Sequence, residues 1–342
     1  MRRGLVALAA LLGALLVAQG ALVLSAPPMR PLATEPLSPD AADAPVDDGL
    51  WLARAFGPWL IHESDPTFGR QDIPSAMDFD GDRDARDNWE EFASYELVPT
   101  VYYTIVETST HYFLSFHLYH PRDWARVALG IQDTHEGDGE NVQIVVSKAS
   151  MEVVLLTTQA HYKMWSYAPF PGPIRGAEET LRGTFEIIEG HPVVLVESGG
   201  HGIYGGNDPR AWNRLSRVRD DLVQYRPAAE GENVTEPPVQ TNETIPYRLV
   251  SLPAFLANST DHPTLFASPV DFDGRPTPRY HAGDRYSGPL GNSRGISPFA
   301  IGYGWSRGEL GSLFWDPAAR YQRALEIDGE WSREYVGHPF SP

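Results

Sequence analysis

An acidic segment that contains a histidine, DTHEGDGENVQIVV from Asp133 to Val146, holds the residues best suited to chemistry. His135, Asp138 and Glu140 follow the pattern H-x-x-D-x-E. Asp138 and Glu140 are two residues apart, so on an extended backbone they project to the same side, and His135 approaches from the preceding loop. This set suits a divalent ion and favours Ca²⁺, Mg²⁺ or Mn²⁺ over Zn²⁺. The alternative is a solvated acidic turn that leads into a strand.

A second acidic cluster, DFDGDRDARDNWEE from Asp78, alternates acidic residues as calcium-binding loops do. It resembles the D-x-D-G-D type of thrombospondin-like calcium repeats. It departs from the EF-hand pattern, because position six is Arg83 and position twelve is Trp89. The alternative is a solvated acidic loop. The candidate calcium ligands are Asp78, Asp80, Asp82, Asp84 and Asp87.

Signals for nucleophilic or nucleotide chemistry are weak. The stretch Glu197-Ser198-Gly199-Gly200-His201 places a serine near a histidine, but it is not G-x-S-x-G and lacks a strand–elbow–helix context. We therefore exclude a serine hydrolase. No P-loop or dinucleotide fingerprint occurs in the sequence.

The segment HEGDGENV, followed by VESGGHGIYG, resembles the vacuolar-sorting-related family of plants, fungi and bacteria. Members carry H-x-G-D-x-E before a strand, a histidine after the next strand, and a later histidine in a small-residue turn followed by Tyr. The matching later positions are His161, His201 and Tyr204, and GELGSLFWDPAAR (308–320) resembles the closing segment. The resemblance covers roughly residues 95 to 320. It implies a fold and a site, because the family's biochemical role is poorly defined.

The spacing of His135, Asp138 and Glu140 also resembles the metal-binding heptapeptide of the necrosis-inducing secreted toxins. That family implies a lectin-like β-sandwich that binds a divalent ion and then a membrane glycolipid. This chain has Gly139 in place of the aromatic residue between the two acids, and it lacks the toxins' cysteines. The toxins have a further upstream Asp as a ligand; Asp133 and Asp123 are the candidates here, but neither lies at the matching distance. The resemblance supports metal chemistry rather than cytolysis.

His161 and His201 each follow a strong strand pattern, where the rim of a sheet presents side chains to a cleft. They are candidates for remaining metal ligands or for a general base beside the ion. The alternative is a surface or hydrogen-bonded core histidine. For His111, His117 and His120 we predict structural roles within a hairpin.

That hairpin is the clearest structural signal. VYYTIVETSTHYFLSFHLYH (101–120) has two β-branched and aromatic halves, which a polar stretch at 107–110 separates. One helix is predicted at 209–225, with four apolar residues on one face: Trp212, Leu215, Val218 and Leu222. Further predicted strands are 141–147, 151–158, 184–189, 192–197 and 247–252. The fold class expected is mainly β, an antiparallel β-sandwich with few short helices and long loops.

Composition narrows the classes of partner. The net charge of −18 disfavours nucleic acid and suits cations. The chain has no Cys, which excludes disulfides, zinc–thiolate sites and cysteine nucleophiles. Hydrophobic residues make up 42% of the chain, enough for a core.

The first residues are typical of export. A short positive start precedes an apolar run at 5–24, which is either a cleaved signal peptide or a retained membrane anchor. We predict three parts: the signal or anchor at 1–25, a flexible linker at 26–49 and one β-sandwich domain at 50–342. The expected location is secreted or extracytoplasmic, with membrane attachment through the first part if the anchor is retained.

Three functions stay open from sequence alone. The first is a metal-organised binding module for a polar ligand, such as a glycan or a lipid head group. The second is a metal-dependent hydrolase with His161 or His201 as general base. The third is a surface protein that calcium only stabilises.

Overall fold

The computed structural model describes most of the chain after residue 48, in stretches that belong to one compact unit, Asp47–Pro342. The predicted signal or anchor segment and nearly all of the predicted linker lie outside the described residues. None of the helices in these stretches is both long and apolar enough to cross a membrane. The described stretches are 49–81, 88–126, 132–160, 163–177, 180–208, 221–257, 270–272, 275–277 and 312–339.

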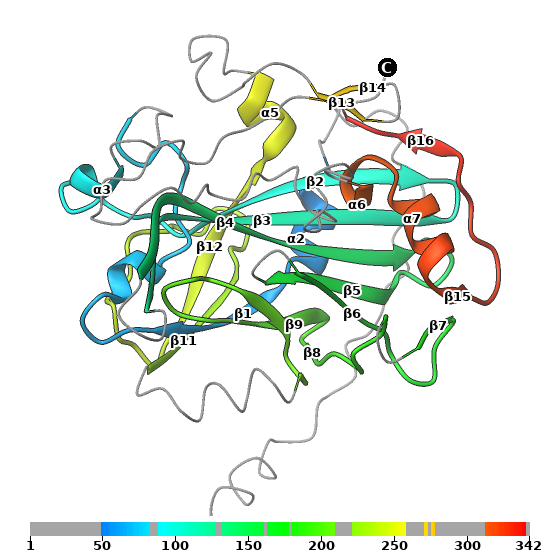
Figure 1. Cartoon of the computed structure of the whole chain (residues 1–342), viewed down its shortest axis with the longest axis horizontal. Helices are drawn as coiled ribbons and strands as arrows, with labels where there is room; N and C mark the ends of the chain where they lie inside the picture. The colour runs from blue at the N-terminus through cyan, green and yellow to red at the C-terminus, as the bar shows by residue number, and fades with distance from the viewer. Residues whose placement is uncertain are drawn as a thin grey trace, which may run out of the picture. The chain divides into compact units, whose positions relative to one another are not determined.

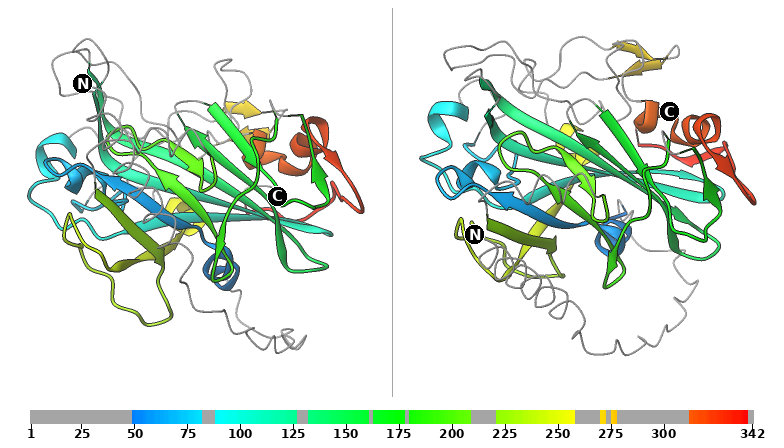
Figure 2. Two further views of the ribbon diagram at one scale, coloured as in Figure 1. Left: turned by 90° about the horizontal axis from the view of Figure 1, so that it is seen from below. Right: turned by 60° about the horizontal axis from the view of Figure 1, so that its bottom comes forward.

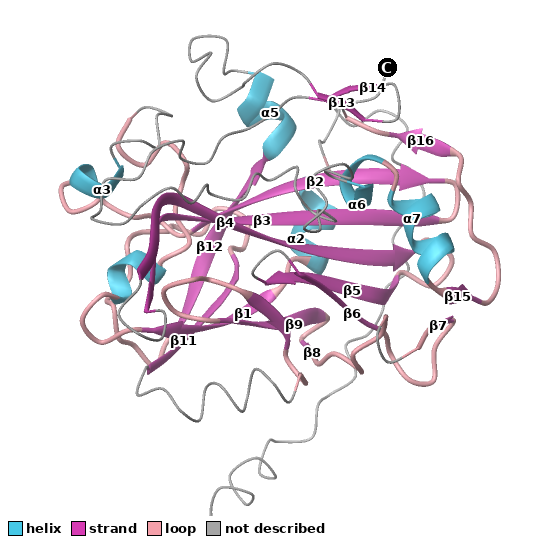
Figure 3. Cartoon of the chain, viewed as in Figure 1, coloured by secondary structure: helices cyan, strands magenta, loops and turns pink. Residues whose placement is uncertain are grey.

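The described residues are mainly β, as predicted, and short helices lie around the sheet (Figures 1 and 3). The strands are β1 (Trp59–Ser64), β2 (Thr100–Thr108), β3 (His111–Arg126), β4 (Gln132–Ser147), β5 (Glu152–Ala160), β6 (Lys163–Tyr167), β7 (Ile174–Arg175), β8 (Ile187–Ile188), β9 (His191–Val196), β10 (Ile203–Gly205), β11 (Asp221–Pro227), β12 (Thr244–Ser251), β13 (Val270–Phe272), β14 (Arg275–Thr277), β15 (Glu326–Ile327) and β16 (Tyr335–Gly337). The helices are α2 (Leu50–Phe56), the 3₁₀ turn η1 (Gly69–Asp72), α3 (Asn88–Glu91), α5 (Leu252–Ala257), α6 (Ser312–Trp315) and α7 (Pro317–Ala324).

The main sheet is mixed, not purely antiparallel as predicted. Its strand order is β10-β9-β1-β11-β12-β2-β3-β4-β5-β6, and β8 and β16 pair at its side. Three neighbouring pairs run parallel: β1 with β9, β11 with β12, and β12 with β2. The spacing of strands along the sequence predicts neither the direction of a strand nor its partner. The parallel partners in this sheet are joined by long connections, so they are not adjacent in the sequence.

The predicted hairpin is confirmed and forms the centre of this sheet. β2 and β3 pair from Val101↔Leu118 to Glu107↔Tyr112, and the turn falls at Ser109 and Thr110. β3 and β4 then pair over nearly their full lengths. Both strands run well beyond the apolar stretch that the sequence identifies, so the acidic segment is a strand and not a loop.

The predicted helix at 209–225 is wrong over its last five residues, which begin β11. Residues 209–220 lie outside the described stretches. In β11, Val223 and Tyr225 are buried whereas Leu222 is 43% exposed. This alternation has the period of a strand, and pairing with β1 and β12 on either side satisfies the backbone. Leu222, assigned to the apolar face of a helix, therefore faces outward.

Alternate residues of β3 enter two different cores. Leu114, Phe116 and Leu118 pack with β1, β9, β10 and β11 inside the curve of the sheet. Phe113 and Tyr119 point to the opposite face, where α5, α6 and α7 cover the sheet (Figure 1). A residue one step along β3 thus changes core, which matters for the histidines described below.

The sheet is strongly curved (Figure 2), and the strands at the two ends of its order, β10 and β6, come into contact. Gly205 of β10 lies so close to the ring of Tyr167 of β6 that a Cβ there would be 2.9 Å from two ring carbons. The Tyr167 hydroxyl donates a hydrogen bond to Asp208 Oδ2 at 2.8 Å. Glycine at 205 is therefore needed for close approach of the first and last strands of the order.

We predict that Gly205→Ala lowers the free energy of unfolding by about 1–3 kcal/mol, since the added methyl overpacks the ring of Tyr167. Denaturant unfolding measures the loss. In the double variant with Tyr167→Leu, which removes the distal ring carbons, the two losses should fall short of additivity by at least about 0.5 kcal/mol. Additive losses would show that these strands do not touch in solution.

Candidate metal centre

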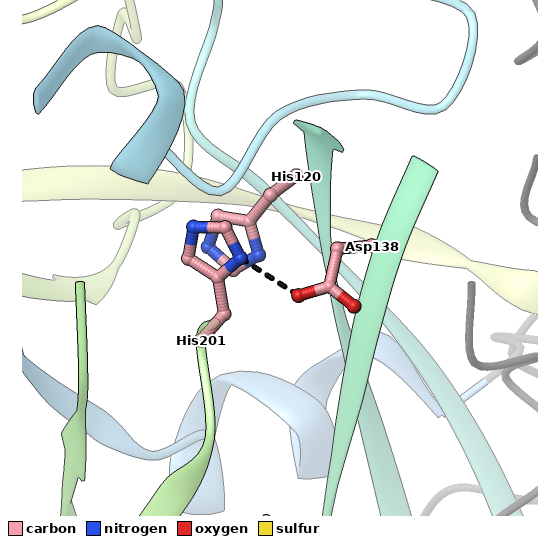
Figure 4. Close-up of side chains that lie close together, drawn as sticks. All are labelled: His120, Asp138 and His201. Atoms are coloured by element: carbon pink, nitrogen blue, oxygen red, sulfur yellow. Dashed lines mark hydrogen bonds and ion pairs between the residues drawn. The ribbon is translucent and has the colours of Figure 1, made fainter. Parts of the chain in front are cut away.

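Three segments far apart in sequence bring His120, Asp138 and His201 together. His120 in β3 is directly opposite Asp138 in β4, so the two side chains leave the same face of the sheet. His201 arrives from the turn between β9 and β10 and lies against both (Figure 4). All three are at most 3% exposed. One candidate ligand atom from each lies within 4.8 Å of the others.

The turn that carries His201 is held in an unusual conformation. His201 has φ 47°, in the left-handed region that side chains other than Gly rarely adopt. The preceding turn is anchored on both sides, because Gly199 N–H donates to Asp72 Oδ1 and Gly199 O accepts from Trp124 N–H, each at 2.9 Å. Backbone strain of this kind is found at functional sites, where neighbouring contacts must over-determine it.

His201 lies between two buried carboxylates. Its Nδ1–H donates to Asp138 Oδ2 at 2.8 Å, and its Nε2 lies 3.3 Å from Asp72 Oδ1. Burial alone would lower the pKa of His201, but the hydrogen bonding and charge of Asp138 and Asp72 outweigh it and raise the pKa to about 10. The imidazole is therefore a cation that neutralises part of the buried negative charge.

His120 and His62 form a neutral pair beside this cation. The His120 ring stacks on His201 with centroids 3.6 Å apart and 7° between planes (Figure 4). His62 Nδ1–H donates to the Glu63 carbonyl at 2.6 Å, so its Nε2 accepts from His120 Nε2–H at 3.2 Å. Burial, reinforced by the charge of His201, holds the pKa of His120 well below its usual range.

This arrangement leaves a ring nitrogen suited to an ion. With Nε2–H committed to His62, His120 Nδ1 is a bare lone pair that is buried and has no hydrogen-bond partner. Two ligand atoms about 2.1 Å from one ion lie roughly 3–4 Å apart, which the 2.8 Å contact of His201 with Asp138 approaches. Asp72 would then support the other nitrogen of His201, an arrangement common around metal-bound histidines. Two imidazoles and a carboxylate thus fit a divalent ion.

The structure places some sequence-predicted ligands in this cluster and others apart from it. Asp138 and His201 belong to it. Glu140 is 1% exposed on the same face of β4, opposite Leu118, but is not one of the three clustered residues. His135 lies in β4 opposite Asp123, and its side chain is outside the described residues, as is the whole of His161.

The calcium loop is described only in part. Asp78 and Asp80 lie in a turn after η1, where Gly81 N–H donates to the Asp78 carbonyl at 3.1 Å. Asp82, Asp84 and Asp87 lie outside the described stretches, so the loop stays a prediction.

Sequence reasoning missed His62, Asp72 and His120. We predicted a structural role for His120 because it ends an apolar hairpin strand, and neither His62 nor Asp72 lies in a recognisable motif. One signal was available: strand parity puts His120 on the opposite face from His117. Only the register of β3 with β4 shows that Asp138 is its neighbour.

Comparisons with known proteins give limited likenesses. No family model and no curated protein matches the chain. Similar solved structures are necrosis-inducing toxin-fold proteins. One is described as "Toxin fold for microbial attack and plant defense", with 18% identity over 48% of this chain and 70% of that one, at a TM-score of 0.31. Another, "NLPPya in complex with mannosamine", has 18% identity over the same shares, at 0.30.

A third is Necrosis and Ethylene inducing Protein 2 from the causal agent of cocoa's Witches Broom disease, with 18% identity over 45% of this chain and 66% of that one, at a TM-score of 0.27. At these TM-scores the overlap does not establish a common fold, and the metal centre stands on its own geometry. Without a matching family model, the resemblance to the vacuolar-sorting-related family gains no support.

We predict that His201 makes the ion-free protein less stable in base. A pKa raised from 6.5 to about 10 contributes stability that is fully present below pH 6.5 and is lost as pH rises toward 10. In chelator, the thermal midpoint should therefore fall from pH 6.5 to pH 9.5. His201→Gln should flatten this fall, whereas His191→Gln, at a half-buried histidine on β9, should not. An unchanged slope in His201→Gln would contradict the assignment.

Proposed function

We propose that this chain is a divalent-metal-binding protein whose ion is held by His120, Asp138 and His201 at one end of the curled sheet. The burial of two imidazoles against a carboxylate supports this most directly. Buried charges are costly unless they are paired or coordinate a metal. Asp72 contacts the second ring nitrogen of His201, and His62 contacts that of His120, so these two residues orient the histidine ligands.

The identity of the ion follows from which ligand set operates. Two imidazoles with one carboxylate favour Mn²⁺, Fe²⁺ or Zn²⁺. The set expected from sequence, His135, Asp138 and Glu140, has two carboxylates and favours harder ions such as Ca²⁺ or Mg²⁺. Asp138 belongs to both sets, so its variants lose metal in either case, and only the histidines discriminate.

The role we propose for the ion is to order a rim that binds a polar ligand such as a glycan or a lipid head group. Trp124 is tied to the His201 turn through Gly199, and its ring lies 5.0 Å from Phe68. Arg122 stacks 3.7 Å above the ring of Phe92. Sites for small polar ligands are commonly lined by aromatic rings and by a few fixed polar or charged groups, such as the guanidinium of Arg122 here. The three aromatic side chains are partly exposed, as a binding rim requires.

A hydrolase is less well supported by this geometry. A general base needs a free lone pair, but in the proposed site His201 binds the ion through Nδ1, and its Nε2 faces Asp72. The three clustered residues are also almost fully buried, whereas a hydrolytic ion needs an open coordination position. His161 stays a candidate base from sequence alone.

The stabilising role of calcium is a separate proposal that rests on the sequence of the 78–87 loop. It predicts that chelation lowers the thermal midpoint and that Ca²⁺ restores it in a variant without the histidine cluster. If Ca²⁺ no longer raised the thermal midpoint in a variant that lacks His120, the calcium would be assigned to the histidine cluster instead.

We predict that purified wild-type protein, dialysed against Mn²⁺, Zn²⁺, Mg²⁺ and Ca²⁺ in turn, retains about one equivalent of one metal by elemental analysis. His120→Ala, His201→Ala and Asp138→Asn should each reduce retention, because each loses a ligand or its charge. Loss of a single ligand should weaken binding by at least about tenfold, since even outer-shell changes cost that much.

Two matched variants complete this test. His191→Ala, a histidine outside the cluster, should retain the metal. His135→Ala separates the two ligand sets: retention there together with loss in His120→Ala supports the histidine cluster. Loss only in His135→Ala would assign the ion to the sequence-predicted set. An absence of metal from wild type under every condition would overturn the proposed function.

A further inference from the structure

The face of the sheet opposite the metal centre carries a polar row that is buried on β2 to β5 and half-buried at its β6 end. Thr104, Ser115, Gln143, Thr157 and Ser166 are direct cross-strand neighbours from β2 to β6. By alternation they share a face with Phe113, Val145 and Leu155 of the core that α6 and α7 cover. Apolar residues are expected on such a face, so an unbroken polar row across five strands needs an explanation.

A second polar row lies two residues along β3, β4 and β5, on the same face of the sheet. His117 Nδ1–H donates to Asn141 Oδ1 at 3.1 Å, and Asn141 Nδ2 donates to Gln159 Oε1 at 2.8 Å. Burial lowers the pKa of His117 to about 4, so its ring is neutral. The side chains in these two rows are thus uncharged donors and acceptors, unlike the carboxylates on the other face of β3 and β4.

Helices α6 and α7 satisfy only part of these rows. Gln143 Nε2 donates to Ser115 Oγ at 2.9 Å and to the Leu313 carbonyl at 2.6 Å. The Tyr321 hydroxyl donates to Thr157 Oγ1 at 2.8 Å. Four buried polar atoms are left without a hydrogen-bond partner: Thr104 Oγ1, His117 Nε2, Gln143 Oε1 and Gln159 Nε2.

These four atoms form a pattern rather than isolated defects. Their residues are at most 2% exposed, and a buried polar group without a hydrogen bond destabilises the fold. The four atoms come from four adjacent strands, so they are spread over roughly 14 Å across the sheet. Along the strands their residues are about two positions apart, or roughly 7 Å. Two of the atoms are acceptors, the amide nitrogen is a donor, and the Thr hydroxyl is both. A hydroxyl group also donates and accepts, so several hydroxyls on one small molecule complement this set.

We infer that the buried polar rows bind a small, neutral, hydroxyl-rich molecule, of the polyol or monosaccharide class, on the face of β2–β5 opposite the metal centre. The absence of charged side chains from the two described rows argues against an anion or a cation. Ordered water is the competing occupant, because water also satisfies buried donors and acceptors. This site does not depend on metal binding, so chelation should leave it intact.

The test begins with native mass spectrometry of the purified protein, which detects a co-purified ligand. Glycerol, myo-inositol, glucose and mannose are then titrated calorimetrically in chelator. Isosteric Thr104→Val should weaken binding of the best probe about three- to tenfold, since one hydrogen bond is lost. Gln159→Leu should weaken it at least as much, because the amide donor is removed.

The matched control is Thr158→Val, the same isosteric change at the residue next to Gln159, on the opposite face. It should leave probe affinity unchanged. Equal weakening in Thr104→Val and Thr158→Val would overturn the assignment of the site. Failure of all four probes to bind wild type, with no co-purified mass, would overturn the ligand and leave water as the occupant. Neither outcome bears on the metal centre, because its test uses different variants.

Discussion

The pairing of His201 with Asp138 and Asp72 is the interaction on which this end of the molecule depends. Each carboxylate would be costly in the interior without a cation, and the imidazolium supplies one. The pairing also joins β4, η1 and the turn before β10, which have no backbone ladder in common. These contacts maintain the strained φ of His201. They also hold the candidate ligand atoms in place, so that an ion would bind where the imidazolium proton of His201 lies in the ion-free protein.

Much of the central sheet was predictable because it depends on local pattern. The 101–120 hairpin is rich in β-branched and aromatic residues on both sides of a polar break, and it is confirmed. Sheet closure and the parallel pairs were not predictable, since β1 finds its partners through contacts that no local pattern encodes. The helix predicted over Asp221–Tyr225 is wrong because four apolar residues at helical spacing suggested a helix. The competing strand pattern, in which buried and exposed residues alternate, is short, and pairing with neighbouring strands stabilises it.

The site was predictable in part. Asp138 and His201 were identified from acidic and glycine-rich patterns in the sequence. His120 was not, because a histidine at the end of an apolar strand is most often structural, and its role depends on a cross-strand partner eighteen residues later. His117 and His120 illustrate the reason: three residues apart on one strand, they face two different cores, one with uncharged polar groups and one with paired charges.

The position of β1 in the sheet order has a consequence for how the protein reaches this structure. Its neighbours β9 and β11 follow it in the sequence by roughly 130 to 160 residues. During synthesis, both edges of β1 therefore have no partner strand until those segments have been added. Closing loops of that length is entropically costly and slow compared with hairpin formation. The β2–β5 meander, whose contacts are local, can therefore assemble first and serve as the template. His62 lies on β1, and His201 lies between β9 and β10, so the charged cluster is complete only when this closure of the sheet has been made.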